Sequence, residues 1–238
     1  MVNLRSISIA AESWVFMARD LNGKHIVVVG ASGVLGTTFT SQLIAAGAKV
    51  SAVVRDASKL EVSRFSKVVV ADVCDSAAVK NAFTSLAPFD GVINATGVVS
   101  FGNTVELDDV SLQKLFAINA IAPIVMLRES ASHIGEGGFF VNLSGVVAQQ
   151  PVAGMAAYSA SKAASWAAMM GAGRELRRQK IDVIDARPPH TETGLSTRPL
   201  AGVAPALPTG LEPAAVAARI IAGIIAGERD IPVESFTS

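Results

Sequence analysis

One tyrosine and one lysine in this sequence have a spacing that suits acid–base chemistry. Tyr158 is followed four positions later by Lys162, and on a helix positions four apart share one face. A free tyrosine has a pKa of about 10, and a nearby ammonium stabilises the phenolate, which makes the phenol usable as an acid or base at neutral pH. The chain has no other tyrosine, so Tyr158 is the sole candidate for phenolic chemistry. The alternative is a pair of ordinary surface residues.

A second group of residues has the pattern of a phosphate-binding turn. The stretch from Gly30 to Gly36 reads Gly-Ala-Ser-Gly-Val-Leu-Gly and lies between a predicted strand and a predicted helix. Glycines allow a tight turn and close approach of the backbone, while free amides and the helix dipole attract the pyrophosphate of a dinucleotide. Glycine also occurs in other strand-to-helix turns, but the position after the first strand favours a cofactor site. The predicted contacts are Gly30, Ser32, Gly33, Val34, Leu35 and Gly36.

The end of the second predicted strand bears on the choice of cofactor. An acidic side chain there would bind the free ribose hydroxyl of NAD, but the sequence has Val54 and Arg55. Arginine favours the extra phosphate of NADP, so we expect NADP, with NAD as the alternative and a solvated loop charge as the competing role of Arg55. Asp72, followed by Val73 beyond the third strand, is expected either to bind the adenine amino group or to form the turn.

The elements that must position these groups alternate along the chain. Short apolar runs rich in valine and isoleucine predict strands, and the stretches between them predict helices. The predicted strands span 25–29, 49–54, 67–71, 91–95, 139–143, 181–186 and 230–233, and the predicted helices span 34–46, 76–86, 110–134, 157–179 and 213–226. This βαβ order predicts an α/β fold with a doubly wound, Rossmann-like parallel sheet, in a single domain over residues 23–238 that follows a loose tail of residues 1–22.

Composition excludes several classes of partner. Twenty Lys and Arg balance twenty Asp and Glu without a basic stripe, which argues against nucleic acid, and arginines interrupt the most apolar regions, which argues against a membrane span. Cys74 is the one cysteine, so no intramolecular disulfide and no cysteine-based metal site is expected. A cytoplasmic location fits, with Cys74 as a small buried hydrophobe. We therefore expect a small-molecule substrate and no metal.

Together these motifs resemble the short-chain dehydrogenase/reductase family. The resemblance rests on Tyr-x-x-x-Lys, the glycine turn, Asn94-Ala95-Thr96-Gly97 after the fourth strand and the Val-Asn-Leu-Ser end of the fifth, and it extends from about Lys24 to the C-terminus. It implies an oxidoreductase that transfers a hydride between a nicotinamide cofactor and a small, hydrophobic carbonyl or alcohol substrate. In the family the tyrosine transfers the proton, the lysine binds the nicotinamide ribose and lowers the tyrosine pKa, a serine polarises the carbonyl, and an asparagine supports a proton relay.

The same resemblance implies further site residues. The relay asparagine matches Asn119, and Pro123 supports this match because proline has no amide hydrogen for the Asn119 carbonyl, which is then free to hold a water. An ordinary helix kink is the alternative. The implied cofactor contacts are Asn94, Ala95, Thr96, Gly97, Tyr158, Lys162, Pro188, Thr191 and Thr193. The residues expected to line an apolar substrate pocket are Val99, Phe101, Val146, Val147, Met155, Leu195 and Leu200.

The sequence departs from the family pattern at two places. The glycines at 30, 33 and 36 are evenly spaced, as in longer, epimerase-type relatives, although the chain is too short for their added substrate domain. The family's serine lies thirteen residues before the tyrosine, where this chain has Gly145, so we expect the neighbouring Ser144 to supply the hydroxyl through a bend in the loop. The alternatives are a cofactor-binding regulatory or scaffold protein that has lost turnover, and an epimerase-like enzyme.

The family also packs its two long central helices across two-fold axes. In the predicted helix 157–179, small residues alternate with Trp166, Met169 and Met170, which would allow close approach of a second helix. We therefore expect a homodimer or homotetramer. Burial of this face against the chain's own sheet is the alternative.

Overall fold

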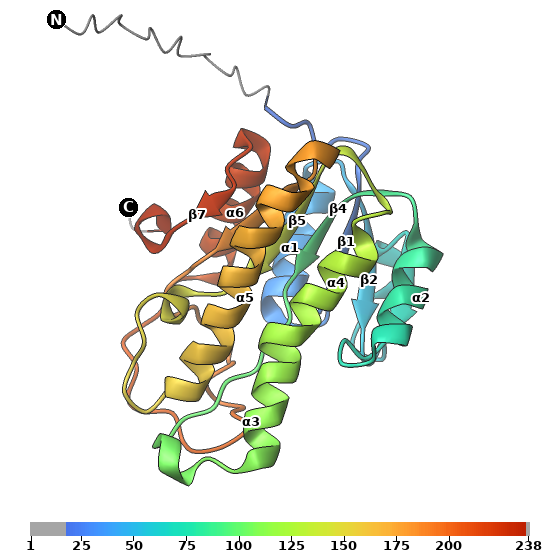
Figure 1. The fold of residues 1–238 in the computed structure, drawn as a ribbon. Coiled ribbons are helices and arrows are strands. Elements are labelled where there is room, and N and C mark those ends of the chain that lie inside the picture. Colours follow the sequence, from blue (N-terminus) through green and yellow to red (C-terminus); the bar gives the residue numbers. More distant parts are fainter. Residues whose placement is uncertain (1–17, 237–238) are drawn as a thin grey trace, which may run out of the picture.

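The predicted parallel sheet is present. In the computed structural model, which describes residues 18–236, seven strands form one sheet in the order β3-β2-β1-β4-β5-β6-β7 (Figure 1). The strands are His25–Val29 (β1), Lys49–Val54 (β2), Lys67–Val70 (β3), Phe89–Asn94 (β4), Ile134–Leu143 (β5), Asp182–Ala186 (β6) and Asp230–Ile231 (β7). Every neighbouring pair is parallel, which confirms the doubly wound α/β fold.

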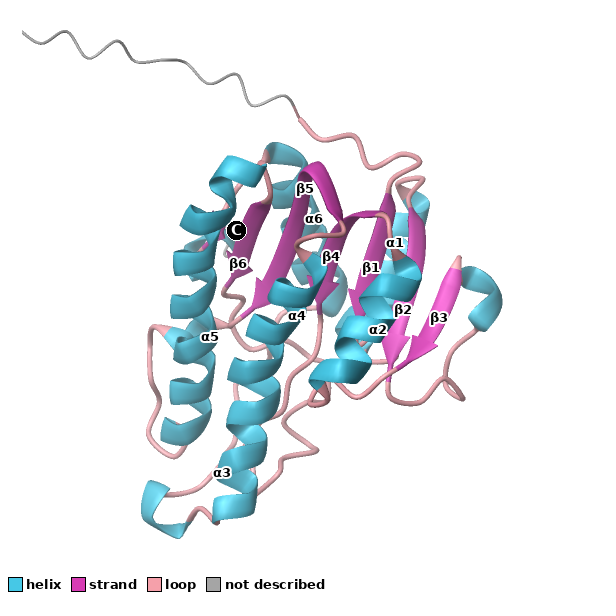
Figure 2. Cartoon of the chain, turned by 45° about the vertical axis from the view of Figure 1, so that its right-hand side comes forward, coloured by secondary structure: helices cyan, strands magenta, loops and turns pink. Residues whose placement is uncertain are grey.

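Helices cover both faces of the sheet (Figure 2). They are Val34–Ala45 (α1), Ser76–Leu86 (α2), Asp109–Phe116 (α3), Ala122–Ser130 (α4), Ala156–Glu175 (α5) and Pro213–Ala226 (α6). Ile26 and Val28 of β1 share a buried cluster with α1 and α6. Val27 and Val29 share another with α2, α4 and α5. Both sides of β1 are therefore buried, as in the central strand of a parallel sheet, and this explains its unbroken apolar sequence.

The long helix predicted over 110–134 is divided. One π-helical turn, Ala117–Ile121, joins α3 to α4, and the Ala122 amide donates to the carbonyl of Ala117 five residues earlier. The helical stretch ends at Ser130, and β5 starts earlier than predicted because the glycines before residue 139 belong to the strand rather than to a turn. A Cβ on Gly138 would lie 2.3 Å from the Asp90 carbonyl oxygen, so glycine there permits close approach of the neighbouring strand.

The folded domain starts before residue 23, where the sequence analysis placed its boundary. Leu21 is buried in the core, and Arg19 forms an ion pair with Asp182 and lies 5.7 Å from the centre of the Phe139 ring. These contacts attach residues 18–22 to the sheet. The rest of the predicted tail, residues 1–17, lies outside the described residues.

One helical stretch has the length and composition of a membrane-spanning helix. Asp109–Ser130, which contains α3, the π-helical turn and α4, reaches a mean hydropathy of 1.7, and 56% of its most apolar window is buried inside the protein. Leu115 and Met126 of this stretch are completely buried. Packing against the rest of the domain therefore accounts for part of its apolar character.

Candidate active site

The predicted motifs meet at the carboxyl ends of the central strands. The strand order reverses between β1 and β4, and sheets of this kind bind ligands in the crevice beyond that point. Val29 at the end of β1 is in register with Asn94 at the end of β4, and Asn94 is in register with Asn142 of β5. The glycine turn, the segment after β4 and the end of β5 are therefore neighbours.

The glycine turn leaves the N-terminus of α1 open to an anion. Gly33 caps this helix without a side-chain hydrogen bond, and the first turn has no acidic residue. Gly30 has a φ of 81°, and a Cβ on Gly36 would lie 2.1 Å from the Gly30 carbonyl oxygen, so both ends of the turn require glycine. Ser32 and Val34 are exposed, which keeps the helix terminus accessible, as pyrophosphate binding requires.

The residues beyond β2 and β3 are accessible at the surface. Arg55 is exposed directly after β2. Asp72 is also exposed, and its carboxylate accepts a hydrogen bond from the Cys74 amide at 2.9 Å, so its turn-forming role is present while an adenine contact stays a prediction. Val73, between Asp72 and Cys74, is buried. Cys74 is exposed in this turn, and the expectation that it is a buried hydrophobe is wrong, because the turn directs it outward from the strand end.

The segment after β4 is held by its own first residue. Asn94 Oδ1 accepts hydrogen bonds from the Thr96 amide at 3.0 Å and the Thr96 hydroxyl at 2.6 Å. The Asn94 amide group in turn donates to Asn142 Oδ1 at 3.2 Å. Ala95 and Thr96 lie against the glycine turn, since a Cβ on Gly30 would be 3.2 Å from the Ala95 carbonyl oxygen.

Lys162 is buried on α5 beside this segment. Its Nζ donates a hydrogen bond of 2.7 Å to the Leu143 carbonyl at the end of β5, and a Cβ on Gly97 would lie 3.4 Å from the same nitrogen. Burial lowers the pKa of Lys162 to about 8, and the negative charge of Asp185 opposes that change. At neutral pH the side chain is therefore a buried cation.

Tyr158 lies one helical turn before Lys162 on the same helix and is half-buried. Burial raises the pKa of its phenol to about 12, whereas the family resemblance implies a lowered pKa. The difference arises because burial is the influence that acts on the phenol here, while the ammonium of Lys162 is directed at the Leu143 carbonyl. In this arrangement Tyr158 keeps its proton at neutral pH and can act as a donor.

Asn119 ties the segment after β4 to α5. It lies in the π-helical turn and is 1% exposed. Its Oδ1 accepts from the Val98 amide at 3.0 Å, and its Nδ2 donates to the Val98 carbonyl at 2.8 Å and to the Ser161 hydroxyl at 3.0 Å. Pro123 follows at the start of α4, where it has no amide hydrogen to donate. A relay water on the Asn119 carbonyl stays a prediction.

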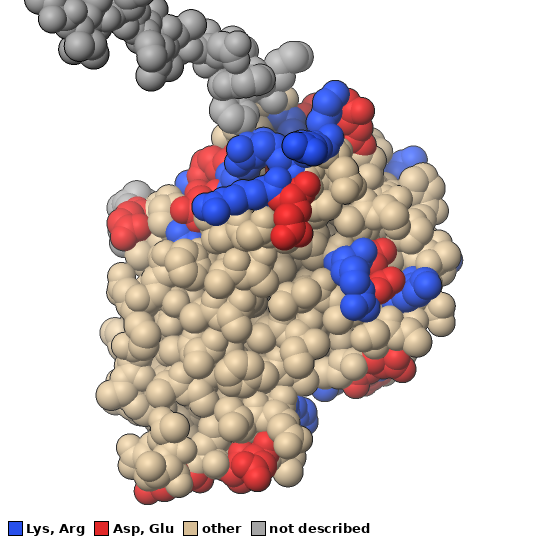
Figure 3. Space-filling view, viewed as in Figure 1, with Lys and Arg blue, Asp and Glu red and all other residues tan. Residues whose placement is uncertain are grey.

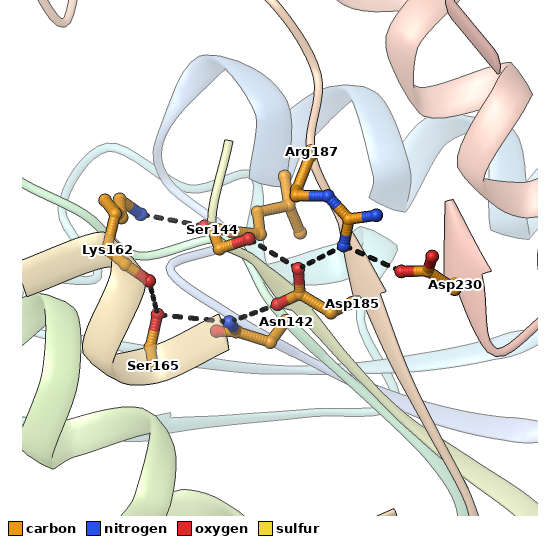
Figure 4. A network of polar contacts seen from close by, with 8 residues as sticks. Asn142, Ser144, Lys162, Ser165, Asp185, Arg187 and Asp230 are labelled. Atoms are coloured by element: carbon orange, nitrogen blue, oxygen red, sulfur yellow. Dashed lines mark hydrogen bonds and ion pairs between the residues drawn. The ribbon is translucent and has the colours of Figure 1, made fainter. Parts of the chain in front are cut away.

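Ser144 follows β5 and is completely buried. Its hydroxyl donates to Asp185 of β6, so a substrate oxygen would have to compete with a carboxylate for the one hydroxyl proton (Figure 4). The loop does bend after β5, because Gly145 has a φ of 77°, but Ser144 is directed toward the neighbouring strand. The carbonyl-polarising role of Ser144 stays a prediction.

Beside Lys162 lies a polar row, buried at Asn142 and Asp185 and exposed at Asp230, that the sequence analysis missed. Asn142, Asp185 and Asp230 are in register on β5, β6 and β7. Asn142 Nδ2 donates to Asp185 at 2.8 Å. Arg187 lies between the two acids, with its Nη1 3.4 Å from Asp185 Oδ1 and 2.7 Å from Asp230 Oδ1 (Figure 4). A charged residue inside the predicted apolar strand 181–186 was the signal that could have revealed this row.

The proline-rich loop after β6 packs on the segment after β4. The Leu200 amide donates to the Val99 carbonyl at 2.8 Å, and the Phe101 amide donates to the Ala201 carbonyl at 2.9 Å. Val99 and Phe101 are consequently buried. At the start of the loop, the Thr191 hydroxyl donates to the Pro189 carbonyl at 3.0 Å. The other predicted residues of this region that are half-buried are Val146, Val147, Met155, Thr193, Leu195 and Leu200, whereas Pro188 is buried.

Known proteins resemble this chain in sequence and in fold. The short chain dehydrogenase family model matches residues 24–201. The cyclic-di-GMP-binding biofilm dispersal mediator protein of Escherichia coli is 30% identical over 75% of this chain and 78% of its own. The 2,3-dihydro-2,3-dihydroxybenzoate dehydrogenase of the same organism is 29% identical over 74% and 73%. A short chain dehydrogenase from Burkholderia cenocepacia, solved in complex with NADP, superposes with a TM-score of 0.78 at 26% identity, over 90% of this chain and 98% of its own.

Proposed function

Because this chain belongs to the short-chain dehydrogenase/reductase family of oxidoreductases, we propose that it transfers a hydride between NADP and the carbonyl or alcohol group of a small, apolar substrate. The observation that carries the proposal is the pairing of Tyr158 and Lys162 on one face of α5, next to Gly97 and the end of β5. This is the place where the strand order predicts a ligand.

The residues present suit a dinucleotide. The α1 N-terminus, with Gly30 and Gly36 giving close approach, would hold the pyrophosphate through backbone amides. Gly97 leaves room beside the Lys162 ammonium, which would bind the nicotinamide ribose. Arg55, exposed after β2, would pair with the extra phosphate and so favour NADP over NAD. The named relative from Burkholderia cenocepacia supports this choice, since it was solved with NADP.

The protein's own groups would manage the proton. NADP, when bound, supplies or accepts the hydride. Tyr158 holds its proton at neutral pH and would give it to the oxygen of a carbonyl undergoing reduction. In the structure the Lys162 ammonium bonds the Leu143 carbonyl, and if it turned toward Tyr158 during the reaction its positive charge would favour the phenolate that remains. Asn119 fixes the backbone at Val98 beside the pair. Ser144 would polarise the substrate oxygen only after its proton leaves the hydrogen bond to Asp185.

The proposal is tested by NADPH oxidation with a panel of ketones and aldehydes. We expect turnover with at least one apolar carbonyl compound and its loss in Tyr158→Phe, while NADPH binding by fluorescence titration is retained. Ser85→Ala, which removes a hydroxyl on α2 remote from the site, is the matched control and should keep full turnover. Equal turnover in wild type and Tyr158→Phe would refute the assignment.

A cofactor-binding regulatory protein is the second candidate. The observation that favours it is the absence of a free polarising hydroxyl in the described part of the β5 loop, where Gly145 has none and Ser144 bonds Asp185. One relative is named as a cyclic-di-GMP-binding mediator of biofilm dispersal. Tight NADPH binding without turnover on any carbonyl compound in the panel would support this candidate.

We also propose that the chain forms a homodimer or homotetramer in the cytoplasm. The face of the molecule over α3, α4 and α5 is broadly free of charge in the view of Figure 3. Val110 of α3, Ile121 of the π-helical turn and Ile124 of α4 are exposed, with exposed fractions of 74%, 57% and 44%. Apolar surface of this extent is usually covered by a partner, and a second copy of the same helices would be self-complementary. Light scattering that shows a monomer at micromolar concentration would remove this proposal.

A further inference from the structure

Asp185 is a buried acid that the proposed reaction does not use. It is 1% exposed on β6, and its carboxylate receives hydrogen bonds from the Ser144 hydroxyl and the Asn142 amide group. Arg187 contacts it from its own strand, and Asp230 of β7 balances part of the Arg187 charge. A carboxylate this deep costs several kcal/mol to ionise unless other groups compensate it. Because this cost must be offset by several other groups, we looked for a role of the Asp185 charge in the site.

The same carboxylate is linked to Lys162 in two ways. Ser144, which bonds Asp185, directly follows Leu143, whose carbonyl accepts the hydrogen bond from Lys162 Nζ at 2.7 Å. The charges of Asp185 and Lys162 also attract each other across this short bridge, and each favours the ionised form of the other. Figure 4 shows Lys162 and Asp185 on either side of the β5 strand end.

We propose that Asp185 is a positioning residue for Lys162: it supplies the buried negative charge that keeps the ammonium protonated and, through Ser144, fixes the strand end that holds the ammonium in place. The inference rests on the proposed function for its purpose, since a neutral Lys162 could not stabilise the phenolate of Tyr158. The charge coupling between Asp185 and Lys162 can nevertheless be measured whether or not the protein catalyses the proposed reaction.

Burial and the surrounding charges set the pH range in which Asp185 and Lys162 are both ionised. Asp185 faces Arg187 on its own strand, Lys162 on α5, and the neutral groups of Asn142 and Ser144 on β5. Burial raises the pKa of Asp185 to about 6 and lowers that of Lys162 to about 8. Both groups are therefore charged between these values, which is the range in which the lysine is expected to be held as a cation.

The test is an NMR titration of the lysine side chains in the intact protein without cofactor. The Lys162 signal is identified by its loss in Lys162→Met, and its pKa is followed in wild type and in Asp185→Asn. The amide oxygen can still accept the Ser144 hydrogen bond, while the amide nitrogen replaces the oxygen that accepts from Asn142, so this variant removes the charge and that second hydrogen bond. We expect the pKa of Lys162 to fall by about one pH unit or more. The matched control is Asp230→Asn, which removes the other acid beside Arg187 and should leave the Lys162 pKa unchanged.

A second measurement needs no variant. In wild type the Lys162 signal should show a smaller step near pH 6, where Asp185 titrates, in addition to its own titration. Absence of that step, or an unchanged Lys162 pKa in folded Asp185→Asn, would overturn the inference. Failure of the proposed function has a different signature, because it would appear as missing NADPH binding or turnover while the Lys162 titration stays coupled to Asp185.

Discussion

The hydroxyl of Ser144 donates to the carboxylate of Asp185 across neighbouring parallel strands, although the two residues are 41 positions apart in the chain. Because of this contact, the proton of the hydroxyl best placed to polarise a substrate carbonyl is already bonded to a carboxylate. The contact also ties the end of β5 to a charged residue of β6.

Ser144→Ala should raise the pKa of Asp185, because the Ser144 hydrogen bond is the strongest of the influences that oppose the effect of burial. Turnover should fall by less than the roughly hundredfold that loss of an oxyanion donor causes, since the hydroxyl proton is engaged elsewhere. Steady-state kinetics and a carboxyl NMR titration check both points. A loss of about a hundred- to thousandfold with unchanged NADPH affinity would show instead that Ser144 turns to the substrate during reaction.

Gly145→Ser should lower the free energy of unfolding by about 1–3 kcal/mol, because the backbone there has a φ of 77° and a ψ of 163°, a conformation that is almost restricted to glycine. Space is available, since a Cβ would be 3.7 Å from the Pro188 carbonyl oxygen. Gly145→Ala carries the same backbone cost without a hydroxyl and is the control. Denaturant unfolding measures the cost. If turnover rises in the serine variant but not in the alanine variant, position 145 faces the substrate.

Arg55→Ala should weaken NADPH binding by roughly tenfold to a hundredfold while leaving NADH binding nearly unchanged, because a charge-assisted hydrogen bond to the extra phosphate is lost. Fluorescence titration with both cofactors measures the two affinities. Arg177→Ala, another exposed arginine beyond the end of α5, controls for the change in net charge. Equal losses for both cofactors would be inconsistent with a phosphate contact by Arg55.

The stability of wild type relative to Asp185→Asn should decrease as the pH rises from about 4 to about 6. Burial raises the pKa of Asp185 to about 6, above the value of about 3.9 for an unfolded aspartate. The folded state therefore binds this proton more tightly, and its contribution is complete below the unfolded pKa and lost as the pH passes the folded one. The expected loss is on the order of 2 kcal/mol. Denaturant unfolding of both proteins at fixed protein concentration checks it, and a difference that grows in favour of wild type would have the wrong sign.

The sequence predicted the order of elements well because each depends on local periodicity. The bounds of β1, β2, α2 and α6 agree with the residues predicted for them. The start of β5 was missed because Gly135, Gly137 and Gly138 are typical of turns, and the place of Gly138 in a strand depends on how closely Asp90 approaches. The residues of the tail were likewise misplaced, because the contacts of Arg19 are with Asp182 and Phe139, far along the chain.

The site was predictable as a set of residues but not as an arrangement. Spacing along one helix places Tyr158 and Lys162 on a common face, yet the pKa of each depends on burial by other elements. The direction of Ser144 depends on the register of β5 with β6, which no local pattern encodes. For the same reason the sequence alone did not distinguish Asp185 from other charged residues in strands, and its electrostatic interaction with Lys162 could be recognised only in the folded structure.

The account as a whole predicts hydride transfer that requires the phenol of Tyr158. The direct measurement uses NADPH deuterated at the transferable position of its nicotinamide ring, an apolar carbonyl compound that supports NADPH oxidation, and mass spectrometry of the alcohol formed. Wild type should place deuterium on the carbon of the former carbonyl group, and Tyr158→Phe should form little labelled alcohol while still binding NADPH. Binding of NADPH by wild type with no labelled alcohol from any compound in the panel, or equal labelling by both proteins, would contradict the account.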